Sequence, residues 1–301
     1  MSTLADILIN VPLDFPPKLD APEIRAREEL RDILKSTPVI VINEVAKYFF
    51  DVFWEEKDCL KDSDFPCVAP PFPLFWMEYR VPKMITGGKP PMTVPMEFGG
   101  QRVGFFWGME ERAADSLGWD LTSYMFVEDG DCAVGPLYSV RLETDSLGQP
   151  ARPTGSFLPK DLHTKPDEAE IAHTTMFTLH YPAFLAICFM HCSNVQLEDH
   201  RPKDSHLRKH QKLYGRAPIV YKTLNITPMQ NIIRSKGGPS CGLKQALHIM
   251  RGHFKQFDKK PLFGKHKGLW WWSSQLRGSL KHGYIKKNYE VHPPKKDQPE
   301  H

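Results

Sequence analysis

Residues 245–278 read QALHIMRGHFKQFDKKPLFGKHKGLWWWSSQLRG and combine three histidines, two arginines, three consecutive tryptophans and a single acid, Asp258. Apolar and polar residues alternate over most of 247–257, which predicts a β-strand. On such a strand Arg251, His253 and Lys255 lie on one face, about 6.5–7 Å from one neighbour to the next. An imidazole between two cations is suited to a phosphate group, so we expect the functional chemistry in this stretch.

The charge of the chain is divided between its two parts. The net charge of +3 hides 22 Lys+Arg against 5 Asp+Glu in residues 200–301, a local net of +17. Residues 1–199 keep 17 of the 39 basic and 31 of the 36 acidic residues, a net of −14. Such an asymmetry predicts a basic face for a polyanion.

The composition and the hydrophobic pattern of the sequence indicate which broad class of protein to expect. A hydrophobic content of 41% and a charged content of 25% are typical of a soluble globular protein, and no apolar run is long enough to cross a bilayer. The N-terminus lacks the pattern of a secretory signal, so we expect an intracellular protein without membrane contact. The six cysteines have no repeated spacing, which favours reduced thiols.

No cofactor or metal is expected. Cys188, His191 and Cys192 have the spacing of one helical face, which a zinc site could use, but the sequence supplies no matching fourth ligand. The pattern therefore favours a buried apolar helix.

The predicted fold class is α+β in two units, with a boundary in the Pro-containing segment 149–166. The acidic unit, residues 1–165, is expected to contain helices over 21–34 and 39–55. An antiparallel meander follows, with strands at 75–81, 102–110, 121–128 and 137–144.

The basic unit, residues 166–301, is expected to contain helices and a small antiparallel sheet. Residues 167–192 are predicted to be mostly helical and bent or split by Pro182. A basic helix over 203–214 should end at Gly215, which suits the position after a helix. Strands are predicted from residue 194, at 219–226 and at 283–291, and a basic glycine-containing loop at 234–240.

The order of these C-terminal pieces resembles a family. The pieces are Asn194-Val195, the basic segment 201–215, Gly237-Gly238, the His-x-x-Arg-Gly-His motif at 248–253, and the Trp-rich strand that ends in Arg277-Gly278. The arrangement is similar to a group of uncharacterised proteins of phages, prophages and plasmids, over about the last 110 residues. The resemblance implies a mobile-element origin and hence the cytoplasm of a bacterial host, and it implies no mechanism.

The first functional hypothesis is nucleic-acid binding without catalysis, with RNA or single-stranded DNA as the partner. Lysine and arginine neutralise phosphates, and aromatic rings stack on unpaired bases. The residues proposed for these contacts are Arg234, Lys236, Lys259, Lys265, Lys267, Trp271 and Lys286.

The second hypothesis is metal-independent cleavage of RNA. This reaction needs a base, an acid and cations that stabilise the charge on phosphorus. His253, with either His248 or His266, would move the protons, and Arg251, Lys255 and Arg277 would hold the charge. On one regular strand His248 and His253 face opposite ways, so their convergence needs a bulge near Gly252.

A third hypothesis gives the function to the acidic unit. A surface with a net charge of −14 could bind a protein partner, act as an inhibitor that mimics nucleic acid, or cover the basic region of its own chain.

Overall fold

We analysed the chain with a computed structural model, which describes most of the first 226 residues and several shorter stretches after them. The described residues are 3–10, 21–50, 65–82, 99–111, 118–145, 147–151, 153–158, 166–226, 246–250, 253–259, 261, 266–272, 275–277 and 279–284.

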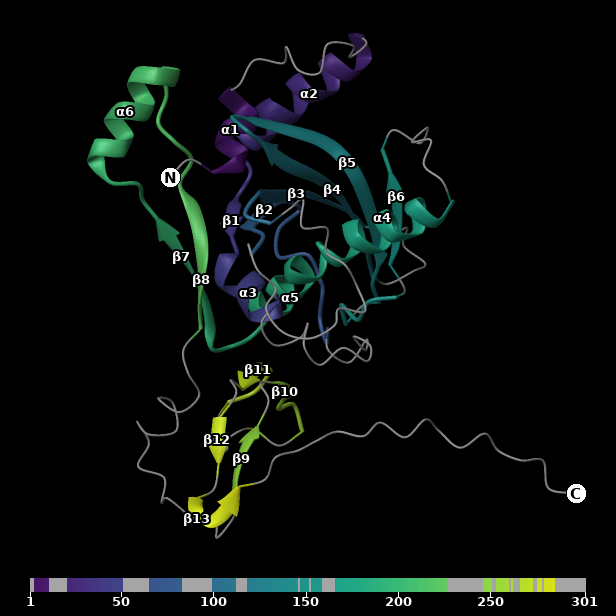
Figure 1. Ribbon diagram of the computed structural model, residues 1–301, viewed down its shortest axis with the longest axis vertical. Helices are drawn as coiled ribbons and strands as arrows, with labels where there is room; N and C mark the ends of the chain where they lie inside the picture. The colour runs from purple at the N-terminus through teal and green to yellow at the C-terminus, as the bar shows by residue number, and fades with distance from the viewer. Residues whose placement is uncertain are drawn as a thin grey trace, which may run out of the picture.

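A large mixed sheet forms the centre of the molecule (Figure 1). Its strand order is β6-β5-β4-β3-β2-β1-β8-β7, and β1 runs parallel to both of its neighbours while all other pairs are antiparallel. The strands are β1 (Val39–Val41), β2 (Leu74–Arg80), β3 (Arg102–Glu111), β4 (Trp119–Asp129), β5 (Cys132–Glu143), β6 (Thr154–Phe157), β7 (Val195–His200) and β8 (Tyr221–Ile226).

Helices cover both faces of this sheet, and each face has its own core. Phe75, Met77 and Tyr79 of β2 belong to the larger core, which includes α3 and α5, whereas Trp76 belongs to the smaller core with α1. This alternation along one strand explains why β2 is apolar on both sides. The helices are α1 (Leu4–Asn10), α2 (Ala21–Leu34), α3 (Asn43–Tyr48), α4 (Pro166–Thr178), α5 (Tyr181–Met190) and α6 (Asp204–Tyr214).

The predicted four-strand antiparallel meander is confirmed, because β2 to β5 pair in sequence order; β6 extends it from within residues 149–166, where the sequence predicts a linker. The same sheet continues across residue 165, where the sequence places the boundary between the two units. Strands β7 and β8, from the basic unit, join the sheet through β1. The fold is therefore a mixed α/β arrangement around one eight-stranded sheet.

The helix predicted over 39–55 is wrong at its start. Val39–Val41 is the short strand β1, and the helix α3 begins only at Asn43. The β-branched sequence Val-Ile-Val suits a strand with neighbours on both sides, and β1 lies between β2 and β8. Residues 51–55 of this prediction lie outside the described residues.

Two boundary predictions are confirmed by the backbone. The helical region around Pro182 is split, since α4 ends at Thr178 and α5 begins at Tyr181 with the proline in its first turn. The basic helix α6 ends at Tyr214, and Gly215 follows in the left-handed conformation with φ 70°.

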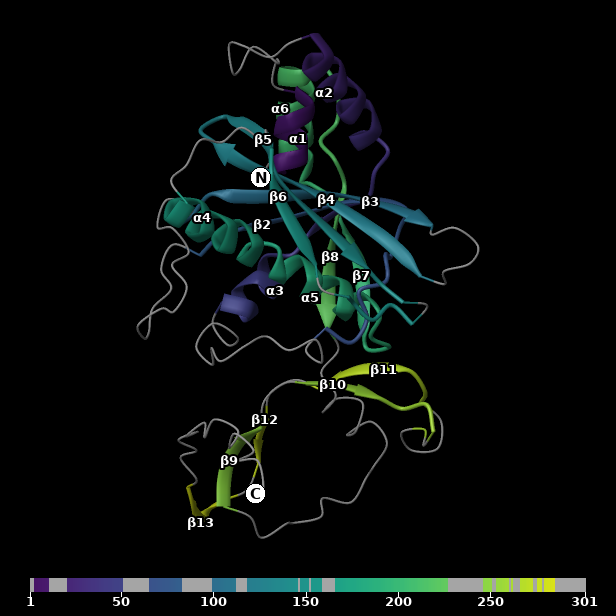
Figure 2. The same cartoon turned by 90° about the vertical axis from the view of Figure 1, so that its right-hand side faces the viewer.

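The last third of the chain adds small sheets below the large one in the views of Figures 1 and 2. A two-stranded antiparallel sheet pairs β10 with β11, and β9 lies between β12 and β13 in a second sheet. Of the predicted last strand, only its first residues lie in β13, and residues 285–301 are outside the described part. The bounds are β9 (Ala246–Met250), β10 (His253–Gln256), β11 (Leu269–Trp272), β12 (Gln275–Arg277) and β13 (Ser279–Tyr284).

A buried carboxylate joins α1 to the centre of the large sheet. Glu78 of β2 is 2% exposed. Its two oxygens accept the main-chain N–H groups of Leu4 at 2.9 Å and Ala5 at 3.1 Å, and the Trp76 indole N–H at 2.9 Å. Burial raises the pKa of Glu78, and these hydrogen bonds oppose that effect.

We expect Glu78→Gln to lower the free energy of unfolding by about 2–4 kcal/mol. The amide NH₂ replaces one acceptor by a donor, which then faces a buried N–H group. Urea denaturation measures the change, with Glu29→Gln on the exposed surface of α2 as the matched control. Equal stability of the two variants would show that the Glu78 hydrogen bonds do not hold α1.

Candidate nucleic-acid interface

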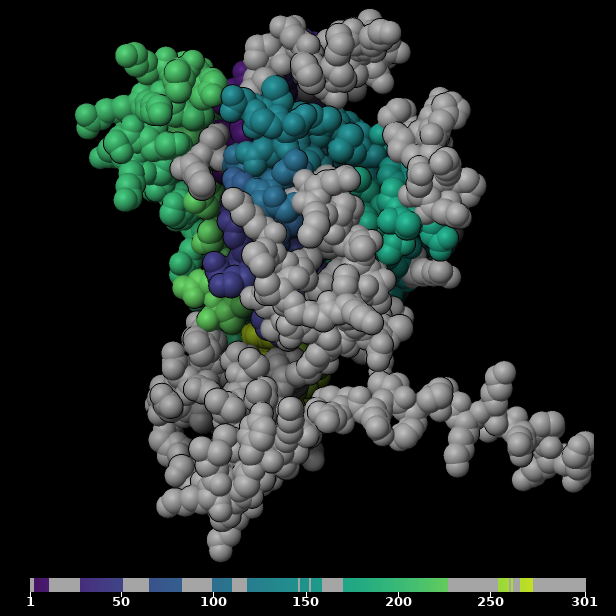
Figure 3. Space-filling model, viewed as in Figure 1, coloured from purple at the N-terminus to yellow at the C-terminus, as the bar shows by residue number. Residues whose placement is uncertain are grey.

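The helix α6 and the residues beside it carry a dense positive charge. Within 201–216 the chain has six basic residues and one acid, Asp204. Five of the six are exposed, and Figure 3 shows this segment, in green, at the outer edge of the molecule. We call these five the α6 patch: Arg201, Lys203, Arg208, Lys209 and Lys212.

The sequence of α6 explains both the helix and its orientation. His210 is buried, and Arg208, Lys209 and Lys212 have the spacing that puts them together on the outer face. Asp204 in the first turn and Lys212 in the last turn match the helix dipole. The helix is closed by the Gly215 N–H, which donates to the Gln211 carbonyl at 2.9 Å.

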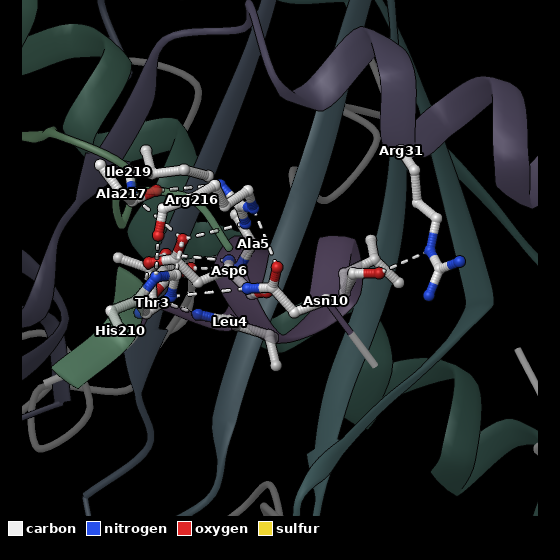
Figure 4. A network of polar contacts seen from close by, with 12 residues as sticks. Thr3, Leu4, Ala5, Asp6, Asn10, Arg31, His210, Arg216, Ala217 and Ile219 are labelled. Atoms are coloured by element: carbon white, nitrogen blue, oxygen red, sulfur yellow. Dashed lines mark hydrogen bonds and ion pairs between the residues drawn. The ribbon is translucent and has the colours of Figure 1, made fainter. Parts of the chain in front are cut away.

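A polar network ties α6 to α1 (Figure 4). The Arg216 guanidinium donates to Asn10 Oδ1 at 2.8 Å and to Asp6 Oδ1 at 3.3 Å. The same Asp6 oxygen accepts the Ile219 N–H at 3.0 Å, and Asp6 is 1% exposed. His210 Nδ1 lies 3.0 Å from the Arg216 carbonyl. These contacts fix the turn after α6, and therefore the direction in which the α6 patch faces.

The single strand predicted over 247–257 is wrong as one element, because its residues are divided between β9 and β10, which belong to different sheets; β10 pairs with β11. His253 pairs with Trp272, Phe254 with Trp271, Lys255 with Trp270 and Gln256 with Leu269. Facing residues of an antiparallel pair project from the same side, so the two sides of this ribbon differ. One side carries Phe254 and Trp271.

Trp271 is not the exposed stacking residue that the sequence suggests. It is 4% exposed and packs against Phe189 of α5, with ring centroids 4.8 Å apart, and against Phe254 at 4.7 Å. Its main chain is held by Asn194, whose side chain donates to the Trp271 carbonyl and accepts the Trp271 N–H, both at 3.0 Å. Trp271 therefore attaches the ribbon to the body of the protein.

The other side of the ribbon is also closed. Trp270 and Trp272 are 5% and 8% exposed. The Lys255 ammonium lies 5.3 Å from the Trp272 ring centre and 5.1 Å from that of Phe257, in cation–π geometry. The three consecutive tryptophans therefore pack internally, and among the described residues of this region the exposed cations are Lys255, Lys259 and Lys267, beside the exposed acid Asp258.

The strand register bears on the histidines proposed for RNA cleavage. His248 faces Arg277 across the pair β9–β12, and His253 faces Trp272 across β10–β11. These two strand pairs belong to different sheets, and the residues that connect them, 251–252 and 273–274, lie outside the described part of the chain.

The remaining predicted residues have mixed outcomes. Arg251, Arg234, Lys236, Lys265 and Lys286 lie outside the described residues. His266 is partly buried, and its ring meets the edge of Trp270 with centroids 5.3 Å apart. Lys259 and Lys267 are exposed, as a phosphate contact requires. In both Figure 1 and Figure 2, α6 and the β10–β11 ribbon lie at opposite ends of the large sheet.

The structure also contains a serine–histidine pair that no sequence pattern indicates. Ser123 Oγ lies 2.9 Å from His180 Nε2, and His180 Nδ1 lies 2.8 Å from the Met176 carbonyl. The carbonyl requires the proton on Nδ1, so Ser123 donates to Nε2. Both side chains are fully buried, in contact with Phe105 and Trp107, so this pair is structural. No spacing in the sequence links residues 57 positions apart.

We expect Asp6→Ala to destabilise the protein by about 2–4 kcal/mol, because the Ile219 N–H and the Arg216 guanidinium lose a buried acceptor. Hydrogen exchange of the α6 amides should accelerate more than that of α5. Asp32→Ala, which removes only an exposed ion pair with Lys35, should change stability by less than about 0.5 kcal/mol. Unchanged exchange in α6 would contradict the proposed attachment.

The buried His180 predicts a pH dependence of stability. Burial lowers the pKa of His180 to about 4, against the opposing hydrogen bond to Met176. Above about pH 6.5 the imidazole is neutral in both the folded and the unfolded state. Between about pH 6.5 and 4 only the unfolded state takes up the proton, so the free energy of unfolding should fall by roughly 3 kcal/mol.

Urea denaturation between pH 7 and pH 4 measures this fall. His180→Gln should flatten the pH dependence, and the exposed His173→Gln should leave it unchanged. Identical slopes for the wild type and His180→Gln would show that His180 is not the group responsible.

No family model matches this chain, and no curated protein matches it either. Among the described residues, no helix is long and apolar enough to cross a membrane. The part of the chain that the structure describes also contains no group of three or more His, Cys, Asp or Glu residues that could hold a metal ion. The function must therefore be inferred from the exposed side chains themselves.

Proposed function

We propose that the protein binds nucleic acid, and that the α6 patch is its main contact with the phosphates. The observation that carries the proposal is the set of five exposed cations on and beside α6, in a segment with one acid. Lysine and arginine at such a surface displace counterions from a polyanion, and that release drives binding.

The dimensions of the helix fit this role. Eleven residues give α6 a length of about 16 Å, which equals the rise of roughly five stacked nucleotides of one strand. Arg208 and Lys212 are one turn apart, so the outer face offers several cations along its length. The network around Asp6 holds that face in a fixed direction, which lowers the entropic cost of binding.

RNA or single-stranded DNA is the proposed ligand. Because the tryptophans of 270–272 are buried, stacking must come from another ring, and Tyr214 at the end of α6 is exposed. Stacking on one exposed ring is tolerant of base identity. The lysines 255, 259 and 267 provide a second, separate set of exposed cations for a long strand. Such binding is compatible with the mobile-element origin that the resemblance implies.

The alternatives receive no comparable support from the described side chains. The ribonuclease hypothesis needs two proton-transferring groups in one place, and His248 and His253 lie on strands of two different sheets, β9 and β10. For the acidic unit, the carboxylates of Glu128 and Asp120 are paired with Arg102 and Arg141 of the same sheet, and such charge contributes less to the attraction of a basic partner. This hypothesis therefore depends on exposed acids such as Glu28, Glu29 and Glu44.

We expect the double variant Arg208→Gln, Lys212→Gln to weaken binding to a labelled single-stranded RNA by about tenfold or more at 0.1 M salt. The slope of log affinity against log salt should become shallower by about 1.4, because two phosphate contacts are lost. Fluorescence anisotropy over a salt series measures both quantities.

The matched control is Lys35→Gln, Lys47→Gln, which removes the same charge from exposed positions on another part of the surface. It should keep the slope of the wild type. If both double variants lose affinity equally, binding follows net charge and the α6 patch is not the interface. Parallel titrations with single-stranded DNA and a duplex decide the preferred form.

A further inference from the structure

Cys67 lies partly exposed beside a tight turn. The Val68 N–H donates to the Gly148 carbonyl at 2.8 Å, which holds the segment around Cys67 against the turn 145–148. Gly148 has φ 77°, and a Cβ atom there would lie 2.8 Å from the Cys67 sulfur. The glycine therefore allows the turn to pack directly on the thiol, while Cys67 as a residue stays partly exposed.

The imidazole of His191, just after α5, lies beside Cys67. His191 Nε2 lies 2.8 Å from the carbonyl of Ala69, two residues after Cys67, and the ring interacts with the Cys67 side chain. An imidazolium has two N–H donors, so it can donate to the carbonyl and still stabilise a thiolate.

The ionisation of both groups agrees with this geometry. Burial by itself raises the pKa of Cys67. Hydrogen bonds to His191 and to the Ala69 main chain lower it, as does the charge of His191, and the net result is a pKa below the usual value. The hydrogen bond to Cys67 raises the pKa of His191 against the effect of burial. Asp145 is the nearby charge that opposes the thiolate.

The neighbouring cysteines of α5 behave differently. Cys188 and Cys192 are buried, and burial raises the pKa of the Cys188 thiol strongly and that of Cys192 to about 12. Both stay protonated near neutral pH, and a protonated thiol is a poor nucleophile. Cys67 is thus the reactive member of this cluster.

We propose that Cys67, activated by His191, is a modification site that reacts with hydrogen peroxide or a small organic hydroperoxide. The thiolate attacks one peroxide oxygen, so that an S–O bond forms while the O–O bond breaks. The sulfur is oxidised to sulfenic acid and the peroxide is reduced. With hydrogen peroxide, the departing hydroxide takes the proton of the His191 imidazolium and leaves as water.

The first test compares cysteines within the intact protein. At pH 6.5, iodoacetamide should alkylate Cys67 at least about ten times faster than Cys132, because the thiolate stabilised by His191 is the nucleophile. Cys132 of β5 is the matched control, since it is also reduced and partly exposed. Peptide mass spectrometry resolves the rate at each cysteine. With peroxide and dimedone, the adduct should form at Cys67 first.

The variant His191→Gln keeps a donor for Ala69 but removes the charge. It should slow Cys67 to the rate of Cys132 and leave Cys132 unchanged. Equal rates at the two cysteines in the wild type, or a Cys67 rate that His191→Gln does not alter, would overturn the proposal.

A second measurement covers the case in which His191→Gln does not fold. The pH profile of wild-type alkylation should level off for Cys67 at a lower pH than for Cys132. Coincident profiles would overturn the proposal as well. None of these readouts depends on nucleic-acid binding.

Discussion

The buried carboxylate of Glu78 is the constraint on which the arrangement of the N-terminal face depends. An ionised carboxylate inside a core is costly unless hydrogen-bond donors replace water, and here three N–H groups do so. Two of these donors are the first amides of α1, which have no partner within the helix. The need of Glu78 for donors and the need of α1 for acceptors are thus met by one contact. It places a seven-residue helix, too short to be stable alone, at the middle of the sheet.

That contact extends to the edge of the sheet through Asp6. Because α1 is fixed by Glu78, the Asp6 carboxylate of the same helix has a fixed position, and it holds the Arg216 guanidinium and the Ile219 amide. The turn after α6 is therefore placed by a helix some 200 residues earlier in the chain. The acidic N-terminal part and the basic C-terminal part are joined here through specific buried partners, which is a stronger constraint than attraction between two oppositely charged surfaces.

Local patterns predicted the elements that local chemistry determines. Alternation found the strands of the meander, Pro182 marked the break between α4 and α5, and Gly215 marked the end of α6. Sequence patterns gave wrong predictions where contacts with residues distant in the sequence determine the local structure. Val39–Val41 is a strand because β2 and β8 flank it, and Trp271 is buried because Phe189 and Asn194 receive it. The Cys67–His191 contact joins residues 124 positions apart, and periodicity carries no information at that separation.

Because the three tryptophans are buried, electrostatic attraction rather than base stacking should dominate the proposed binding of nucleic acid. Residues 245–278 combine cations with aromatic rings, and this pattern suggests that stacking and charge act together on a nucleic acid. In the structure, the rings and the charges have separate roles. Trp271 attaches the ribbon through its contact with Asn194, and the Lys255 ammonium lies over the Trp272 ring. Among the described residues, the densest group of exposed cations is on and beside α6, which carries none of the three tryptophans. The proposed nucleic-acid binding by such a surface depends on the spacing of phosphates more than on the identity of bases, so it should respond to ionic strength more than to sequence.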